Sequence, residues 1–246
     1  MIETLSLLIH ADAKIGKTTL AATSPVPILV IDAEGGWKFL PIRMTEWNPM
    51  DGPPPLYDGT WDACHVTLRT WEELLQIYQW LDYGQHNFRS VVLDSITELQ
   101  RKLKSNLRGE EVMRIQDWGD LLVKMDTKIT GFRDLTLHPR NPVQVVVFIA
   151  ESRANSKGKM IPSMQGQIST SLPYRVDVVG YLFTQDLPND AGQYDGTNKV
   201  RRLLVSPNDQ FEAGERVQGR LGMCVDYPNI TNMLIQVYPS LQQQQV

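Results

Sequence analysis

Several apolar stretches of strand length are spaced along the chain. Each is continuous rather than alternating, and most are rich in β-branched residues. Such runs are typical of strands that are covered on both faces, as in a parallel sheet flanked by helices. The sequence therefore predicts an α/β fold with a mainly parallel sheet. The predicted strands are residues 4–10, 27–32, 90–94 and 143–150, with a weaker one at 64–68.

Helical patterns separate these strands. Thr70 and Glu73 form a capping-box pattern, and apolar residues then recur on one helical face. Two longer helical stretches are expected at residues 96–106 and 118–135. The alternation of strands and helices supports the parallel sheet.

The last third of the chain has a different pattern. Two strands, at 177–184 and 199–206, are separated by a polar turn at 187–198, so we expect an antiparallel extension of the sheet. Segments 48–59 and 152–175 show no period and are predicted to be irregular.

The length favours one domain. A chain of 246 residues buries roughly 70–75% of its unfolded surface, enough for a core without disulfides or a structural metal. We predict a single domain over residues 1–236, followed by a disordered, Gln-rich tail over 237–246.

Composition excludes several classes of protein. The net charge is −4, the two cysteines do not form a zinc or disulfide pattern, and no apolar run approaches the ~20 residues of a membrane span. Secreted, membrane, zinc-finger and histone-like proteins are disfavoured, and no membrane partner is expected. We expect a cytoplasmic protein.

A phosphate-binding loop is the strongest local motif. It follows the first strand and opens a helix, where backbone N–H groups and the helix N-terminus can surround phosphates. Lys17 would reach the β- and γ-phosphates of ATP, and the Thr18 hydroxyl would coordinate Mg²⁺. The predicted nucleotide-binding residues are Ala11, Asp12, Ala13, Lys14, Ile15, Gly16, Lys17, Thr18 and Thr19.

This loop departs from the consensus at its start. Ala11 replaces the first glycine, which restricts φ there, and Asp12 places a carboxylate in the loop. A strand-to-helix turn with a solvated lysine is the alternative. The flanking strand and helix favour the nucleotide site.

Two acidic residues end predicted strands. Asp94 closes residues 90–94 and is expected to provide a second Mg²⁺ carboxylate, on a strand next to that of the phosphate loop. Glu34 follows the second strand and can deprotonate a water that attacks the γ-phosphate. An exposed turn at Gly35 and Gly36 is the equally weighted alternative.

The order of these motifs resembles the RecA-type ATPase core. GKTTLA, IDAEGG, VVLDS and VVVFIAES follow one another as in that family. In particular, the chain is similar to compact, phage-encoded RecA-like ATPases of the Sak type, which are grouped with AAA-family or nucleotide-binding proteins. The resemblance covers about residues 4–225.

The resemblance implies a RecA-like P-loop NTPase core that hydrolyses ATP with Mg²⁺. Lys17 and Glu34 would be catalytic, with Glu34 as general base. Thr18 and Asp94 would hold Mg²⁺, and Glu151 would sense the nucleotide at a strand end and signal to DNA. A phage-encoded protein of this kind would work in the cytoplasm of a bacterial host.

The resemblance also implies partners. Relatives bind single-stranded DNA beside single-stranded-DNA-binding proteins, in recombination and annealing, and we expect a homo-oligomer, either a ring or a filament. DNA would contact two loops, at 106–117 and 152–173. The candidate DNA-binding residues are Arg108, Arg153, Lys157 and Lys159.

A basic residue from the next subunit completes the ATP site in this family. Many relatives carry a lysine near the position of Arg216, but Gly214 and Glu215 stand there. A guanidinium suits the role because it can hold phosphate charge bidentately. The candidates are Arg216, Arg220, Arg201 and Arg202.

Two functions are compatible with these motifs. The first is a DNA-stimulated ATPase of the RecA type that promotes pairing or annealing. The alternative is a nucleotide-gated binding or scaffold protein with weak or no hydrolysis, for which Ala11, Asp12 and the absent lysine argue.

Overall fold

A β-sheet runs through the centre of the computed structural model, which describes residues 3–109, 111–189, 192–194, 196 and 198–244. Its strands are β1 (Leu5–Ala11), β2 (Ile28–Asp32), β3 (Met44–Glu46), β4 (Ala63–Thr67), β5 (Ser90–Asp94), β6 (Val145–Ala154), β7 (Met160–Pro162), β8 (Val178–Asp186), β9 (Lys199–Leu204), β10 (Gly214–Glu215) and β11 (Cys224–Asp226). The helices are α1 (Lys17–Ala21), α2 (Trp71–Asp82), α3 (Ile96–Arg108), α4 (Ile115–Asp134), α5 (Ile168–Ser171) and α6 (Ile230–Val237).

The sheet is parallel in its main part and antiparallel at one end. Its order is β11-β9-β8-β1-β6-β5-β2-β4-β3, with β10 paired to β8 and β7 paired to β6. Neighbours from β8 to β3 are parallel, whereas β9, β10 and β11 pair antiparallel. The predicted α/β fold is confirmed, including the antiparallel extension by the C-terminal strands.

One predicted neighbour relation is wrong. β6 lies between β1 and β5, so the strand that ends at Asp94 is not adjacent to the strand that leads into the phosphate loop. The apolar patterns of these strands are alike, and strand order depends on tertiary packing that the patterns do not encode.

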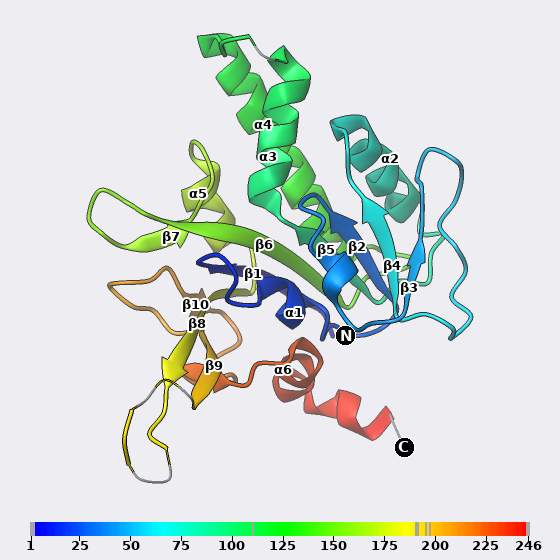
Figure 1. The fold of residues 1–246 in the computed structure, drawn as a ribbon. Coiled ribbons are helices and arrows are strands. Elements are labelled where there is room, and N and C mark those ends of the chain that lie inside the picture. Colours follow the sequence, from blue (N-terminus) through cyan, green and yellow to red (C-terminus); the bar gives the residue numbers. More distant parts are fainter. Residues whose placement is uncertain (1–2, 110, 190–191, 195, 197, 245–246) are drawn as a thin grey trace.

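Helices cover both faces of the sheet (Figure 1), which explains the continuous apolar runs. On one face, α2, α3 and α4 contribute to one core through residues such as Leu81, Leu99 and Phe132. On the other face, α1 and α6 contribute Leu20 and Met233 to a second core. Within the described residues, no helix has the length and apolar character that a bilayer span requires.

Local signals explain the helix starts. The Thr70 side chain accepts a hydrogen bond from the Glu73 N–H at 3.2 Å, and the Glu73 carboxylate accepts from the Thr70 N–H at 3.3 Å. This is the predicted capping box of α2. Ser95 caps α3 by accepting from the Glu98 N–H at 3.2 Å.

The polar segment 152–175 is more regular than predicted. β6 continues to Ala154 because its last residues pair with β7, with Ser152 opposite Pro162. α5 then follows. The short β3 was also not predicted, since three residues carry too little pattern. The predicted turn 187–198 lies partly outside the described residues.

The chain end also differs from expectation. Val237 ends α6, and a 3₁₀ helix, Pro239–Gln244, follows it. Val237 and Leu241 are buried against the second core, so the disorder predicted from residue 237 is wrong at these positions. Residues 245–246 of the predicted tail lie outside the described residues.

Two glycines of α4 provide a matched stability test. Gly119 is exposed, with open space where a Cβ would lie, whereas a Cβ on Gly131 would lie 2.9 Å from the Tyr78 ring. We expect Gly119→Ala to raise the free energy of unfolding by about 0.5–1 kcal/mol, the helix gain of Ala over Gly. Gly131→Ala should instead lower it by about 1 kcal/mol, because Tyr78 packs on Phe132 and cannot move freely. Urea unfolding of both variants checks this, and equal effects at the two sites would contradict it.

Candidate functional site

A cleft of about 680 Å³ opens where β1, β2, β5 and β6 end. Parallel strands present their carboxyl ends at one edge, where ligands bind in open α/β sheets. Of the nine predicted loop residues, Ile15 packs against the core, and the others line the cleft. Glu34, Asp94 and Glu151 line it as well.

The start of the loop accommodates alanine. Ala11 is the last residue of β1, buried and paired with Glu151 of β6. A residue in an extended strand has no need of the conformational freedom of glycine. The unusual backbone lies further on, where Gly16 has φ 101° and Lys14 has φ 63°. The departure from the consensus is therefore compatible with the loop.

Lys17 is folded back over this loop. Its Nζ donates to the carbonyl oxygens of Asp12 at 2.9 Å and Ala11 at 3.2 Å. Burial lowers the pKa of Lys17, while the carboxylates of Glu34 and Asp94 act in the opposite direction. The ammonium is placed at the cleft among acidic groups.

The Asp12 side chain is exposed at the loop. Burial and then the charge of Asp12 raise the pKa of Tyr181. The carboxylate therefore lies close enough to the Tyr181 phenol to interact with it.

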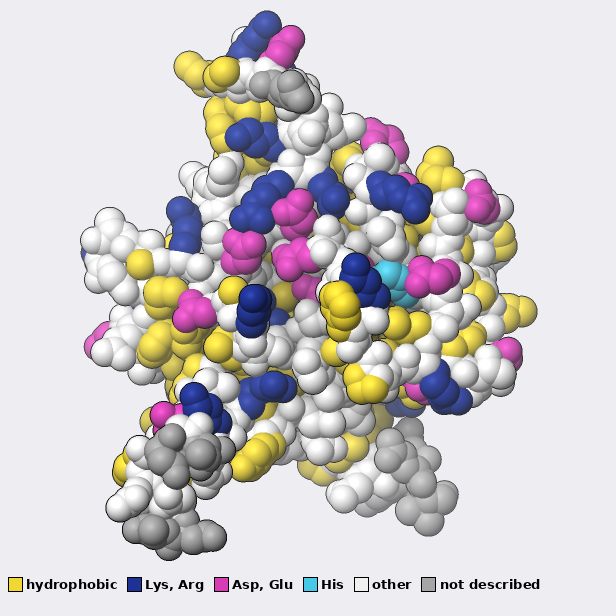
Figure 2. All heavy atoms as spheres, viewed as in Figure 1, with side chains coloured by type: hydrophobic (Ala, Val, Ile, Leu, Met, Phe, Trp, Pro, Cys, Tyr) yellow, Lys and Arg dark blue, Asp and Glu magenta, His cyan; other side chains and the backbone are white. Residues whose placement is uncertain are grey.

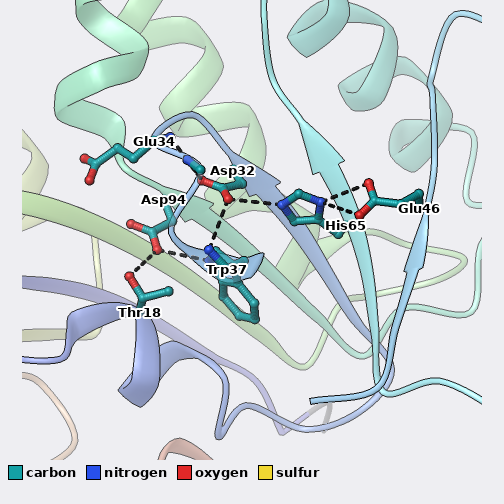
Figure 3. Close-up of polar contacts among 8 residues, drawn as sticks. Thr18, Asp32, Glu34, Trp37, Glu46, His65 and Asp94 are labelled. Atoms are coloured by element: carbon teal, nitrogen blue, oxygen red, sulfur yellow. Dashed lines mark hydrogen bonds and ion pairs between the residues drawn. The ribbon is translucent and has the colours of Figure 1, made fainter. Parts of the chain in front are cut away.

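Thr18 and Asp94 meet across the cleft. The Thr18 hydroxyl donates to Oδ2 of Asp94 at 2.8 Å, and the Trp37 indole N–H donates to the same oxygen at 3.0 Å (Figure 3). A hydroxyl and a carboxylate are hard oxygen donors of the kind that Mg²⁺ prefers. Within the described residues, no group of three His, Cys, Asp or Glu could hold a metal ion. Mg²⁺ bound to this pair would need phosphate oxygens and water as its other ligands.

Asp94 is an energetically costly carboxylate. It is 3% exposed, and burial raises its pKa to about 6, with further contributions from the charges of Glu34 and Asp32. The hydrogen bonds from Thr18 and Trp37 oppose this shift. A cation at this site would relieve the cost.

Glu34 is exposed and faces the cleft from the loop after β2. The Ser95 hydroxyl donates a short hydrogen bond to its carboxylate. Glu34 is thus part of the site, although a general-base role stays a prediction. Ser95 and Trp37 were not predicted as site residues; Ser95 directly follows Asp94, but no sequence pattern indicates the Trp37 contact.

Glu151 connects the cleft to α3. Both of its carboxylate oxygens accept from the Arg101 guanidinium, at 3.1 and 2.9 Å, and Arg101 also contacts Glu98 at 2.9 Å. β6 continues past Glu151 to Ala154, so the predicted strand-end position is wrong, although Glu151 does line the cleft. Its sensor role stays a prediction.

The candidate DNA-binding residues have different surroundings. Arg108 pairs with Asp117 at 2.6 Å, and the helices leave only residues 109–114 between them, with residue 110 outside the described part. Lys159 pairs with Glu212 at 2.8 Å. Arg153 of β6 donates to the Met164 carbonyl at 2.9 Å, just after β7. Lys157 is exposed in the turn between β6 and β7.

The four candidate arginines of the trans-acting finger have different partners. Arg216 and Arg220 donate to backbone carbonyls of their own chain, and Arg202 pairs with Asp226 at 2.8 Å. The Arg201 guanidinium lies against the phosphate loop of the same chain, about 2.7 Å from where a Cβ on Gly16 would be. Arg201 therefore lies beside the phosphate loop of its own chain, and a trans-acting role for any of the four stays a prediction.

Comparison with known proteins finds one family. A family model described as an AAA domain matches residues 3–217. No curated protein matches the chain.

The charge on Asp94 predicts a stability effect. A carboxyl whose pKa is raised by folding costs stability when ionised, and this cost disappears as the pH falls from about 6 toward the unfolded value. In Asp94→Asn, the amide oxygen can still accept from Thr18 and Trp37. We expect the variant without nucleotide to gain about 1–3 kcal/mol in free energy of unfolding at pH 8, and less at pH 5. Chemical unfolding at both pH values measures this; equal gains at the two values would argue against it.

Proposed function

The chain belongs to the AAA domain family, and on that premise we propose that it binds and hydrolyses ATP while acting on single-stranded DNA, in phage-type recombination or annealing. The hydrogen bond between Thr18 and Asp94, at the mouth of the phosphate loop, carries the nucleotide part of this proposal. It joins a loop hydroxyl to a strand-end carboxylate, the two groups expected to hold Mg²⁺.

The side chains around the cleft would divide the work. Loop N–H groups and Lys17 would bind the phosphates, and Mg²⁺, held by Thr18 and Asp94, would neutralise charge on them. Glu34 would orient and deprotonate the attacking water. The Ser95 hydroxyl donates to Oε1 of this carboxylate, and Oε2 can accept from the water.

A basic pocket supports the DNA part. Arg101 and Lys104 of α3 and Arg153 of β6 line one pocket of about 180 Å³. Figure 2 shows Lys and Arg side chains gathered over α3, with acidic side chains beside them. Neutralisation of DNA phosphates by such residues depends on salt.

The basic pocket and the nucleotide cleft share a contact. Arg101 lines the pocket, and its ion pair with Glu151 ends at the cleft wall. A change at the nucleotide can therefore alter the pairing of Glu151 with Arg101, and with it how free the Arg101 guanidinium is to bind a DNA phosphate. This contact supports Glu151 as the nucleotide sensor.

The cellular role is part of the same proposal. A ring or filament of identical subunits would multiply the weak contacts of one basic pocket along a DNA strand. A single-stranded-DNA-binding protein would be the natural partner of such an assembly, in the cytoplasm of the host cell.

The bond between Ser95 and Glu34 favours a second candidate function. If that bond holds the Glu34 carboxylate away from the attacking water when nucleotide binds, hydrolysis is slow. The protein would then be a nucleotide-gated scaffold.

ATPase assays test the main proposal. We expect ATP turnover to rise when single-stranded DNA is added, and to vanish in Lys17→Ala because the phosphates lose their cation. The double variant Lys104→Ala/Arg153→Ala should lose most of the stimulation and bind DNA with a weaker salt dependence. Turnover and DNA retention at two salt concentrations are the measurements.

Arg43→Ala is the control for loss of a guanidinium outside this pocket, because Arg43 pairs with Asp62, and it should retain stimulation. Turnover that ignores DNA, with no DNA retained at low salt, would refute the DNA part. Tight ATP binding with Glu34→Gln equal to wild type would favour the scaffold.

The position of Arg201 predicts an effect on nucleotide affinity. Gly16 belongs to the part of the loop that surrounds the α- and β-phosphates, which ATP and ADP share. We expect Arg201→Ala to weaken binding of both nucleotides roughly tenfold, as for the loss of a hydrogen bond to a charged group. Titration with fluorescent ATP and ADP analogues measures the two affinities.

Arg202→Ala is the matched control for this prediction, since Arg202 is adjacent on β9 but pairs with Asp226. Its affinities should match wild type. Unchanged ADP affinity in Arg201→Ala, with turnover lost, would instead indicate a trans-acting finger.

A further inference from the structure

The carboxylate of Asp32 is the anchor of the loop that carries Glu34. Its Oδ1 accepts from the N–H groups of Glu34 at 3.0 Å and Gly35 at 2.7 Å, and its Oδ2 accepts from the Trp37 N–H at 3.2 Å. Asp32 is 1% exposed at the end of β2. Three backbone amides of one short loop therefore depend on a single buried side chain.

His65 of β4 contacts the same carboxylate from the opposite side. Its Nε2 lies 3.0 Å from Oδ2 of Asp32, and its Nδ1 lies 3.0 Å from both carboxylate oxygens of Glu46 at the end of β3. Ionised carboxylates only accept hydrogen bonds, so when Asp32 and Glu46 are both ionised, both ring nitrogens donate and the ring is an imidazolium. Burial opposes this charge, but the bonds to Asp32 and Glu46 outweigh it and raise the pKa of His65.

His65 lies beside a buried carboxylate, Asp32, and helps to keep it ionised. Asp32 and Asp94 are paired in register on neighbouring strands, and both are buried. Burial alone would raise the pKa of Asp32. The hydrogen bonds from His65, which has the larger effect, and from the three amides lower this pKa instead. An ionised Asp32 keeps all four of its hydrogen bonds.

The loop held by Asp32 positions two side chains, that of Glu34 at the cleft and that of Trp37 at Asp94. Glu34 reaches the cleft from it, and the indole of Trp37 donates to Asp94 at 3.0 Å. Figure 3 shows His65 on one side of Asp32 and the carboxylates of Glu34 and Asp94 on the other. Glu46, His65, Asp32 and the loop form a continuous chain of contacts across three strands.

We propose that His65 is a positioning residue that, through Asp32, holds the loop 33–37 so that Glu34 and Trp37 meet the nucleotide and the metal carboxylate. This proposal rests on the proposed ATPase function for its catalytic consequence. His65 does not touch the cleft; it acts only through the loop.

Two measurements on His65→Leu test the proposal. Without the imidazolium, the amides of Glu34, Gly35 and Trp37 should lose protection from hydrogen exchange, because Asp32 no longer holds an ionised, fixed position. kcat for ATP should fall by about tenfold or more, since small misplacement of a catalytic group has effects up to about 100-fold. The affinity for ATP should stay within about threefold of wild type, because Lys17 and the phosphate loop bind the phosphates, not the clamp formed by Glu46, His65 and Asp32.

His86→Leu is the control for loss of a buried histidine. His86 is as buried as His65, but its side-chain bond is to the Phe88 amide, away from the clamp. Its thermal stability should fall without loss of protection at residues 34–37 or of kcat. If His65→Leu fails to fold, Glu46→Gln serves instead, because Glu46 has a 71% exposed side chain and the change keeps an acceptor for His65. The same losses, smaller in size, are expected.

Unchanged loop protection and unchanged kcat in both clamp variants would overturn the proposal. Equal losses in His86→Leu would also overturn it, by showing a general stability effect. If the wild type does not hydrolyse ATP, the proposed function fails, whereas loop protection still decides whether His65 holds the loop.

Discussion

Two carboxylates lie buried side by side at the ends of adjacent parallel strands, and the site depends on the different hydrogen-bond partners that each receives. Asp32 and Asp94 are in register on β2 and β5. Asp32 receives three amides and the charge of His65, so it stays ionised. Among the described residues, the Asp94 carboxylate receives two neutral donors, and burial raises its pKa to about 6. The first carboxylate is thereby suited to anchor a loop, and the second to accept a cation.

The position of β6 joins the two proposed activities. Because β6 is inserted between β1 and β5, its Glu151 lies beside the phosphate loop, opposite Ala11. The ion pair to Arg101 then extends from the cleft to the basic pocket on α3. One strand thus supplies both the wall of the nucleotide site and, with Arg153, the lining of the pocket proposed for DNA. The proposed communication between the two sites would use this short path.

Local features were predictable because they depend on neighbours in sequence. The capping box of Thr70 and the end of β5 at Asp94 follow from residue types a few positions apart. Other features depend on residues far apart along the chain. Arg201 was a candidate for the ATP site of the next subunit. In the structure its guanidinium lies beside Gly16 of the same chain, far away in the sequence. The β6–β7 hairpin was also missed, because its polar residues carry no strand period.

The sequence by itself determined the α/β class, the phosphate loop and the acidic residues at strand ends, because apolar runs and short motifs are local properties of a chain. Only the tertiary structure decided which of these groups meet. Strand order separated β1 from β5, and the register of β2, β3 and β4 brought His65 between Asp32 and Glu46. Those contacts cross strands whose pairing arises from packing of the whole sheet. The chemistry of each residue is encoded locally, whereas its partners are chosen by the fold.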